Sequence, residues 1–195
     1  MKKIVPANAV LIPAQAKRVF RGVVYDVYQW PQELFDGSTT TFEMLRRPDT
    51  VQVIGVVGDA LLLLNDEQPN RGARMGFPGG RVDEGEDILS AAKREMHEET
   101  GYQFKSWRLN KVWQPFSKIE WFIYCFVAEG GKKTGEPHLD AGERITVELQ
   151  PFAEVSKKVF AKEGYLGEVR EIFEAADSLQ SLLALPEFAG KEVDR

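Results

Sequence analysis

Three carboxylates and a guanidinium occupy one short segment near the middle of the chain. Residues 94–99 read Arg-Glu-Met-His-Glu-Glu. On an α-helix, Glu95, Glu98 and Glu99 stand at i, i+3 and i+4 and therefore share one face. Like charges this close together destabilise a helix unless a cation neutralises them. The segment therefore predicts a divalent-metal site.

The rest of this helix indicates which face is buried. The stripe that contains Glu99 and Glu95 continues back through Ala92 and Ile88, so it begins apolar and ends acidic. A helix whose acids were merely solvated would place them on the outer side instead. The opposite side of the helix is polar and carries Ser90, Lys93 and His97. We predict a helix at 87–100 with its acids turned toward the protein.

The spacing of these residues resembles the Nudix box. That pattern is Gly, five residues, Glu, seven residues, Arg-Glu, an apolar residue, any residue, Glu-Glu, any residue, Gly and an apolar residue. Tyr102 replaces the usual aliphatic residue at the end. The other fixed positions all match, as Gly80, Glu86, Arg94, Glu95, Glu98, Glu99 and Gly101, with Met96 as the internal apolar residue.

The resemblance implies a role for each residue of the box. Glu95 and Glu99 are expected to be the main ligands of Mg²⁺ or Mn²⁺, both of which prefer hard oxygen donors. Glu98 is expected to be a further ligand or to orient the attacking water, and the carbonyl of Gly79 to complete the shell. Arg94 is expected to pair with Glu86 and to fix the loop on the helix. Gly80 and Gly101 are expected to be structural, the latter as the helix C′ residue.

Residues outside the box resemble the branch of the family that hydrolyses ADP-ribose and other nucleoside-diphosphate sugars. Pro115 follows the box at the distance where a proline helps to set the substrate class, and Glu120 falls where that branch places an acid near the metals. The segment HLDAGERITV, with Asp140 and Glu143, resembles the acidic catalytic loop of ADP-ribose pyrophosphatases. Glu143, Glu120 and Glu98 are alternatives for the general base.

Substrate-binding candidates lie upstream of the box. The loop that ends at Arg71 resembles a Gln-x-x-Arg segment that reaches the phosphates in the same branch. A planar guanidinium suits bidentate contact with a diphosphate, so Arg71 is the first candidate and Arg74 the second. Phe20, Tyr28 and Trp30 are aromatic residues of the expected N-terminal strands. They are candidates to stack on a nucleobase across a dimer interface, and core packing is the alternative.

The elements that must position these residues follow from the hydrophobic pattern. Expected strands lie at 18–30, 39–47, 51–57, 60–64, 74–78, 119–128 and 144–150, and expected helices at 87–100, 151–162 and 167–184. This order predicts the α+β class, an α/β/α sandwich with a mixed sheet between helices. We expect a β-rich N-terminal extension at 1–48 and a Nudix domain at 49–195, as in the nucleoside-diphosphate-sugar branch.

Composition restricts the partners of the chain. Its 195 residues carry a net charge of −5, which leaves no broad basic surface for nucleic acid. The single cysteine, Cys125, lies in an apolar run, which excludes a disulfide framework or a thiolate metal site. Pro6 and Pro13 interrupt the apolar N-terminal stretch and argue against a secretory signal. We expect a cytoplasmic homodimer that binds a small nucleotide and neither nucleic acid nor membrane.

The function expected is metal-dependent hydrolysis of a nucleotide sugar of the ADP-ribose type, which gives a nucleoside monophosphate and a sugar phosphate. A Nudix hydrolase of nucleoside triphosphates, dinucleoside polyphosphates or RNA ends is the first alternative, and a shorter N-terminus would favour it. A non-catalytic Nudix-fold ligand sensor is the second alternative. Such a sensor usually lacks the box carboxylates, all of which are present in this chain.

Overall fold

A computed structural model describes residues 2–69, 71–139 and 141–194. The helices are α1 (Ile88–Thr100), α2 (Phe152–Ala161), α3 (Arg170–Glu174) and α4 (Leu179–Ala184), with a 3₁₀ turn η1 (Leu166–Val169). The strands are β1 (Lys2–Val5), β2 (Lys17–Arg21), β3 (Asp26–Glu33), β4 (Thr39–Arg46), β5 (Thr50–Val57), β6 (Ala60–Gln68), β7 (Arg71–Gly76), β8 (Tyr102–Gln103), β9 (Ser106–Trp113), β10 (Ile119–Glu120), β11 (Ile123–Glu129), β12 (Lys132–Lys133), β13 (Arg144–Pro151) and β14 (Lys191–Asp194).

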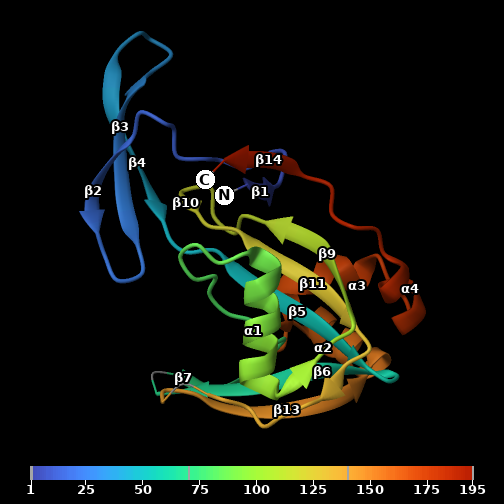
Figure 1. Ribbon diagram of the computed structural model, residues 1–195. Coiled ribbons are helices and arrows are strands. Elements are labelled where there is room, and N and C mark those ends of the chain that lie inside the picture. The colour runs from blue at the N-terminus through green and yellow to red at the C-terminus, as the bar shows by residue number, and fades with distance from the viewer. Residues whose placement is uncertain (1, 70, 140, 195) are drawn as a thin grey trace.

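A mixed sheet of order β13-β6-β5-β11-β9 forms the centre of the fold, with β7 paired to β6. Strand β11 runs parallel to β5, and the remaining pairs of this sheet are antiparallel. Helix α1 crosses one face of the sheet and α2, α3 and α4 cover the other (Figure 1). The predicted α/β/α sandwich is therefore confirmed.

Strand β5 connects the two layers of core because both of its faces are buried. Val51 and Val53 pack in the cluster that includes α1, whereas Ile54 and Val56 pack in the cluster that includes the C-terminal helices. A strand covered on both sides reads as a nearly continuous apolar run. Gln52 is the polar residue in this run, and it lies on the Ile54 face because side chains alternate along a strand.

The N-terminal strands form a sheet of their own, of order β10-β4-β3-β2, that extends away from the central sheet (Figure 1). The expected single strand at 18–30 is wrong, since the chain turns between β2 and β3. Gly22 closes this turn by donating its N–H to the Tyr25 carbonyl at 3.0 Å. Strand β10 joins the sheet by pairing in parallel with β4.

Three other expectations are corrected by the structure. The expected helix at 167–184 is three short elements, because Ser178 caps the start of α4 in a capping box with Ser181. The expected strand at 119–128 is interrupted between β10 and β11, and the loop expected at 65–74 is largely the β6–β7 hairpin. Strands β1, β8, β9, β12 and β14 were not predicted. None of the described helices is long and apolar enough to cross a membrane.

Candidate active site

Local capping defines both ends of helix α1. Asp87 precedes the helix and accepts a hydrogen bond from the Ser90 N–H at 3.0 Å, which satisfies one of the unpaired donors of the first turn. Gly101 follows the helix with φ 73° and donates its N–H to the His97 carbonyl. A Cβ at Gly101 would lie 2.2 Å from the Gly135 carbonyl oxygen. The predicted helix and its terminal glycine are both confirmed.

Arg94 joins the loop before α1 to the acids on the helix. Its Nε and Nη2 donate to the two oxygens of Glu86 at 2.9 and 2.8 Å, the pairing that the box implied. Its Nη1 donates to both Glu95 and Glu98 at 2.9 Å. The pKa of Glu86 is lowered, chiefly by the hydrogen bonds from Arg94. One guanidinium therefore relieves part of the repulsion among the box carboxylates.

Two glycines bring the backbone against the helix acids. The Gly79 N–H donates to Glu99 Oε2 at 2.8 Å. Gly79 has φ 156°, and a Cβ there would lie 2.0 Å from the Val51 carbonyl oxygen. A Cβ at Gly80 would lie 2.5 Å from the Glu95 carboxylate. Only glycine permits the approach at position 79, where a Cβ would meet backbone, and a Cβ at position 80 would displace the end of the Glu95 side chain.

Burial sets the electrostatics of these acids. It raises the pKa of Glu99 well above its ordinary value, and the Gly79 N–H only partly opposes this shift. Burial also raises the pKa of Glu95, against the lowering by Arg94. The charge of Glu143 raises the pKa of both acids, which places Glu143 near them. Buried carboxylates that repel one another are stabilised as anions by a cation.

The donor chemistry of the site fits a hard divalent cation, because carboxylate and carbonyl oxygens are the ligands that Mg²⁺ and Mn²⁺ prefer. Among the residues that the structure describes, no three His, Cys, Asp or Glu side chains already form a complete metal cluster. Arg94 holds an oxygen of Glu95 and of Glu98, so a cation has to compete with this guanidinium for both groups.

A cavity of about 400 Å³ lies beside Glu99 and is lined also by Glu143, Arg71 and Arg74. The structure therefore brings the two candidate arginines to the same cavity as Glu99, whereas Glu95 and Glu98 are not among the residues that line it. Tyr165 forms another part of the wall, with its ring centroid 5.2 Å from the Arg71 guanidinium and 5.4 Å from that of Arg74.

Asp66 fixes Arg71 by accepting a hydrogen bond from its Nη2. Asp66 also lines the cavity, and its charge raises the pKa of Glu99. Asp66 Oδ1 and Arg71 Nη1 are both buried, and neither has a hydrogen-bond partner within the described parts of the chain. These atoms provide one acceptor and one donor for a molecule that enters the cavity.

Glu120 is not brought to this cavity. Its side chain is buried, and its Oε1 accepts from Arg46 Nε at 2.9 Å while its Oε2 accepts from the Ile12 N–H at 2.6 Å. These contacts hold β10 against β4 and the N-terminal segment. Asp140, the other acid of the expected catalytic loop, lies outside the described residues.

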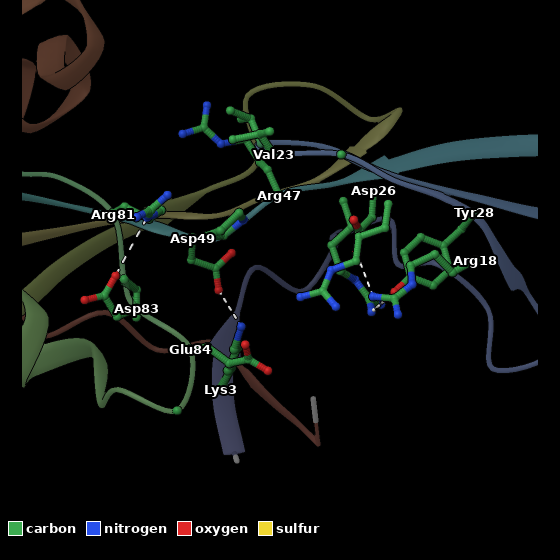
Figure 2. Close-up of a pocket in the computed structure, with 17 residues that line it drawn as sticks. Lys3, Arg18, Val23, Asp26, Tyr28, Arg47, Asp49, Arg81, Asp83 and Glu84 are labelled. Carbon is green, nitrogen blue, oxygen red and sulfur yellow. Dashed lines mark hydrogen bonds and ion pairs between the residues drawn. The ribbon is translucent and has the colours of Figure 1, made fainter.

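The aromatic candidates also lie away from the box acids. Tyr28 lines a separate and larger cavity of about 770 Å³, together with Arg18 and Asp26 (Figure 2). Phe20 lies on β2 with 61% of its surface exposed. Trp30 is buried and packs edge-on against Phe42, which is the core-packing alternative.

Several residues that line the cavity were missed from the sequence, namely Arg47, Gln52, Asp66, Trp121, Tyr165 and Glu168. They come from separate loops and strands, and no spacing in the sequence connects them. The one local signal was Gln52, a polar residue inside an apolar run.

An acid-bearing helix under a two-glycine loop, on an α/β/α sandwich, defines the class of Nudix hydrolases. The NUDIX domain family matches residues 46–168, more than half of the chain. The chain therefore belongs to the Nudix family.

The chain is 29% identical over 136 residues to a methanol dehydrogenase activator from Bacillus methanolicus, which covers 67% of this chain and 73% of the relative. It is 27% identical over 155 residues to an ADP-ribose pyrophosphatase from Bacillus subtilis (strain 168), covering 76% and 83%. A crystal structure of an ADP compounds hydrolase shares the fold with a TM-score of 0.62 at 23% identity, over 76% of this chain and 81% of that one. The expected likeness to the ADP-ribose pyrophosphatase branch is confirmed.

Proposed function

We propose that the protein hydrolyses a nucleotide sugar of the ADP-ribose type to a nucleoside monophosphate and a sugar phosphate. The observation that carries this proposal is one cavity that is lined by Glu99, Glu143 and Arg71 together. A diphosphate needs both kinds of group, cation-binding acids and a guanidinium donor. The relative from Bacillus subtilis, an ADP-ribose pyrophosphatase, supports the choice of substrate.

Glu95 and Glu99 are the proposed ligands of Mg²⁺ or Mn²⁺, with Glu98 and the Gly79 carbonyl as further ligands. When bound, the cation neutralises charge on the phosphoryl oxygens and makes a water more acidic. The Gly79 N–H fixes the orientation of the Glu99 carboxylate at 2.8 Å. Arg94 holds Glu95 and Glu98 in place by hydrogen bonds from its Nη1.

Glu143 is the proposed general base. It lines the cavity, and its charge acts on both Glu95 and Glu99. For Glu120 we propose a positioning role, since Arg46 and the Ile12 N–H bind both of its oxygens.

Arg71 is the proposed phosphate-binding residue, and Arg74 assists it. Asp66 and Tyr165 hold the Arg71 guanidinium, which lowers the entropy lost when it binds a phosphate. Its buried Nη1, which has no hydrogen-bond partner in the described structure, is available to donate to a phosphate oxygen.

A homodimer is proposed through the N-terminal extension, residues 1–48. This extension exposes Phe20, Val23 and Phe35, with 61%, 98% and 114% relative exposure. Phe20 lies on β2, and Val23 and Phe35 lie in the turns at the two ends of β3. Exposed apolar side chains of this kind are typical of a protein interface. Phe20 and Tyr28 would then contact the nucleobase from the partner. Light scattering of the full chain and of Phe35→Ser tests this association.

We also propose a cytoplasmic location, which suits the buried free thiol of Cys125.

Product analysis by ion-exchange chromatography tests the substrate. With Mg²⁺, ADP-ribose is expected to give AMP and ribose 5-phosphate, faster than nucleoside triphosphates react. Glu99→Gln is expected to abolish the reaction, and Glu154→Gln, an exposed acid of α2 paired with Lys157, is the matched control. Faster hydrolysis of nucleoside triphosphates would favour the alternative branch, and no hydrolysis of any nucleotide would refute the proposal.

A further inference from the structure

Gln52 carries a buried amide oxygen that accepts no hydrogen bond from the described residues. Its residue exposure is 8%, and its Oε1 has no hydrogen-bond partner in the part of the chain that the structure describes. On the same face of β5, Ile54 and Val56 belong to the core under the C-terminal helices. Buried polar atoms of native proteins are nearly always bonded, and an unbonded one destabilises the fold. An apolar residue at this position would therefore be better for stability alone.

The position of Gln52 connects this amide to the reaction site. Gln52 lines the same cavity as Glu99 and Arg71. A Cβ on Gly79 would lie 2.9 Å from the Gln52 Cα, so the backbone at Gln52 runs directly against the loop that holds Glu99. The group of a substrate that reaches Gln52 is therefore one close to the diphosphate.

A second buried atom without a partner among the described residues lies in the wall of the same cavity. The Arg47 guanidinium lies 4.3 Å from the centroid of the Trp121 ring, and Trp121 Nε1 donates to Thr50 Oγ1 at 3.1 Å. Thr50 and Gln52 share one face of β5 because they are two residues apart. Arg47 Nε is buried and has no partner among the described residues, and Arg47 also lines this cavity. This wall therefore presents one donor and one acceptor.

We propose that Gln52 is a specificity-determining residue that binds a sugar hydroxyl of the nucleotide substrate, with Arg47 Nε as the second partner. A hydroxyl can donate to the amide oxygen and accept from Arg47, whereas an ionised phosphate has no proton to donate. Turning the amide over exchanges its acceptor for a donor, and a hydroxyl suits both orientations. The edge of a nucleobase has the same chemistry, but the sugar is the part of the substrate next to the diphosphate. This inference rests on the proposed nucleotide-sugar hydrolysis.

Gln52→Leu tests the inference by removing both polar atoms at similar volume. Kinetics are measured with ADP-ribose and with analogues that lack one ribose hydroxyl each. The wild type is expected to lose about tenfold or more in kcat/KM on one of these analogues, because a site that binds a hydroxyl rejects a substrate without it. Gln52→Leu is expected to react about tenfold more slowly with ADP-ribose and to treat that analogue and ADP-ribose alike.

Tyr124→Phe is the matched control, since Tyr124 Oη is another buried atom without a partner in the described structure, on β11 and outside this cavity. It is expected to keep wild-type selectivity.

A binding measurement without metal complements the kinetics. AMP or ribose 5-phosphate, titrated by tryptophan fluorescence, is expected to bind Gln52→Leu about tenfold more weakly than the wild type. Gln52→Met provides a second variant if Gln52→Leu does not fold.

The outcomes separate the inference from the function on which it rests. If the wild type hydrolyses no nucleotide sugar, the proposed function fails. If the wild type is active and Gln52→Leu slows ADP-ribose and every deoxy analogue equally, only the sugar-hydroxyl inference is overturned. A change of selectivity confined to base-modified substrates, with sugar selectivity intact, would overturn it in favour of a base contact.

Discussion

The contact between Gly80 and Glu95 gives the most specific prediction for the proposed metal site. A Cβ at Gly80 would lie 2.5 Å from the Glu95 carboxylate, whereas ordinary contacts begin near 3.4 Å. The difference, 3.4 minus 2.5, means that in Gly80→Ala this carboxylate must retreat by about 0.9 Å. A misplacement of about 1 Å can lower a catalytic rate about 10²-fold. We therefore expect kcat to fall about 100-fold, or about 2.7 kcal/mol in activation free energy.

The fold should tolerate this change, because the displaced atoms are the end of a flexible side chain and Gly80 is not among the described glycines with positive φ. The assay is kcat for ADP-ribose at saturating Mg²⁺, with thermal unfolding measured on the same samples. Gly72→Ala is the matched control, since a Cβ there meets no described atom within 4 Å. A folded Gly80→Ala protein with kcat within twofold of wild type would refute the reasoning.

Four further predictions concern three residues of the cavity. Glu99→Gln should lower kcat by about 10² or more. Burial raises the pKa of Glu99, so the native metal-free protein binds this proton more tightly than the unfolded chain does, and its stability should fall as pH rises above the ordinary pKa of 4.5. Thermal unfolding in EDTA from pH 5 to 8 should show this decrease, and the decrease should be smaller in Glu99→Gln. An equal decrease in the variant would contradict the assignment of the effect to Glu99. Arg71→Ala should raise KM for ADP-ribose about tenfold or more with little change in kcat, and an unchanged KM would move phosphate binding to Arg74. Glu143→Gln should lower kcat about 10²-fold with KM nearly unchanged, and full activity would leave Glu98 as the base.

The sequence predicted the elements whose signals are local. Helix α1 could be predicted because its apolar stripe and its terminal Gly101 lie within a single segment. The β5–β6 hairpin could be predicted because two apolar runs flank Gly58, which has φ 61°. The helix acids and their loop followed from spacing alone, since both occupy fewer than 25 consecutive residues.

Elements whose stability depends on distant partners could not be predicted in this way. Strand β9 lies at an edge of the central sheet, and Arg108 and Lys111 interrupt its apolar pattern. Strands β1 and β14 pair Lys2 with Asp194 across nearly the whole chain, which no window of sequence reveals. The break before α4 depends on side-chain caps rather than on periodicity, which continues through it.

Most residues that line the cavity could not be predicted either, because they come from distant parts of the chain. Tyr165 follows α2 and contacts Arg71 in β7, more than 90 residues earlier. Its N–H donates to the Met75 carbonyl at 2.9 Å, and this bond ties the C-terminal part of the chain to the cavity wall. Such convergence comes from tertiary packing, so the sequence indicated Glu99, Arg71 and Arg74 but not most of the other residues that line the cavity.

The attachment of Arg94 to Glu86, Glu95 and Glu98 has a consequence for how the protein exchanges its metal. Arg94 is an internal counter-ion that offsets part of the negative charge of these acids and holds Glu95 and Glu98 in place. A cation that binds Glu95 or Glu98 displaces the Arg94 guanidinium as well as water. Its net binding free energy is therefore the difference between its own interaction with these acids and that of Arg94. Reversible binding of a divalent cation is the expected result of this competition.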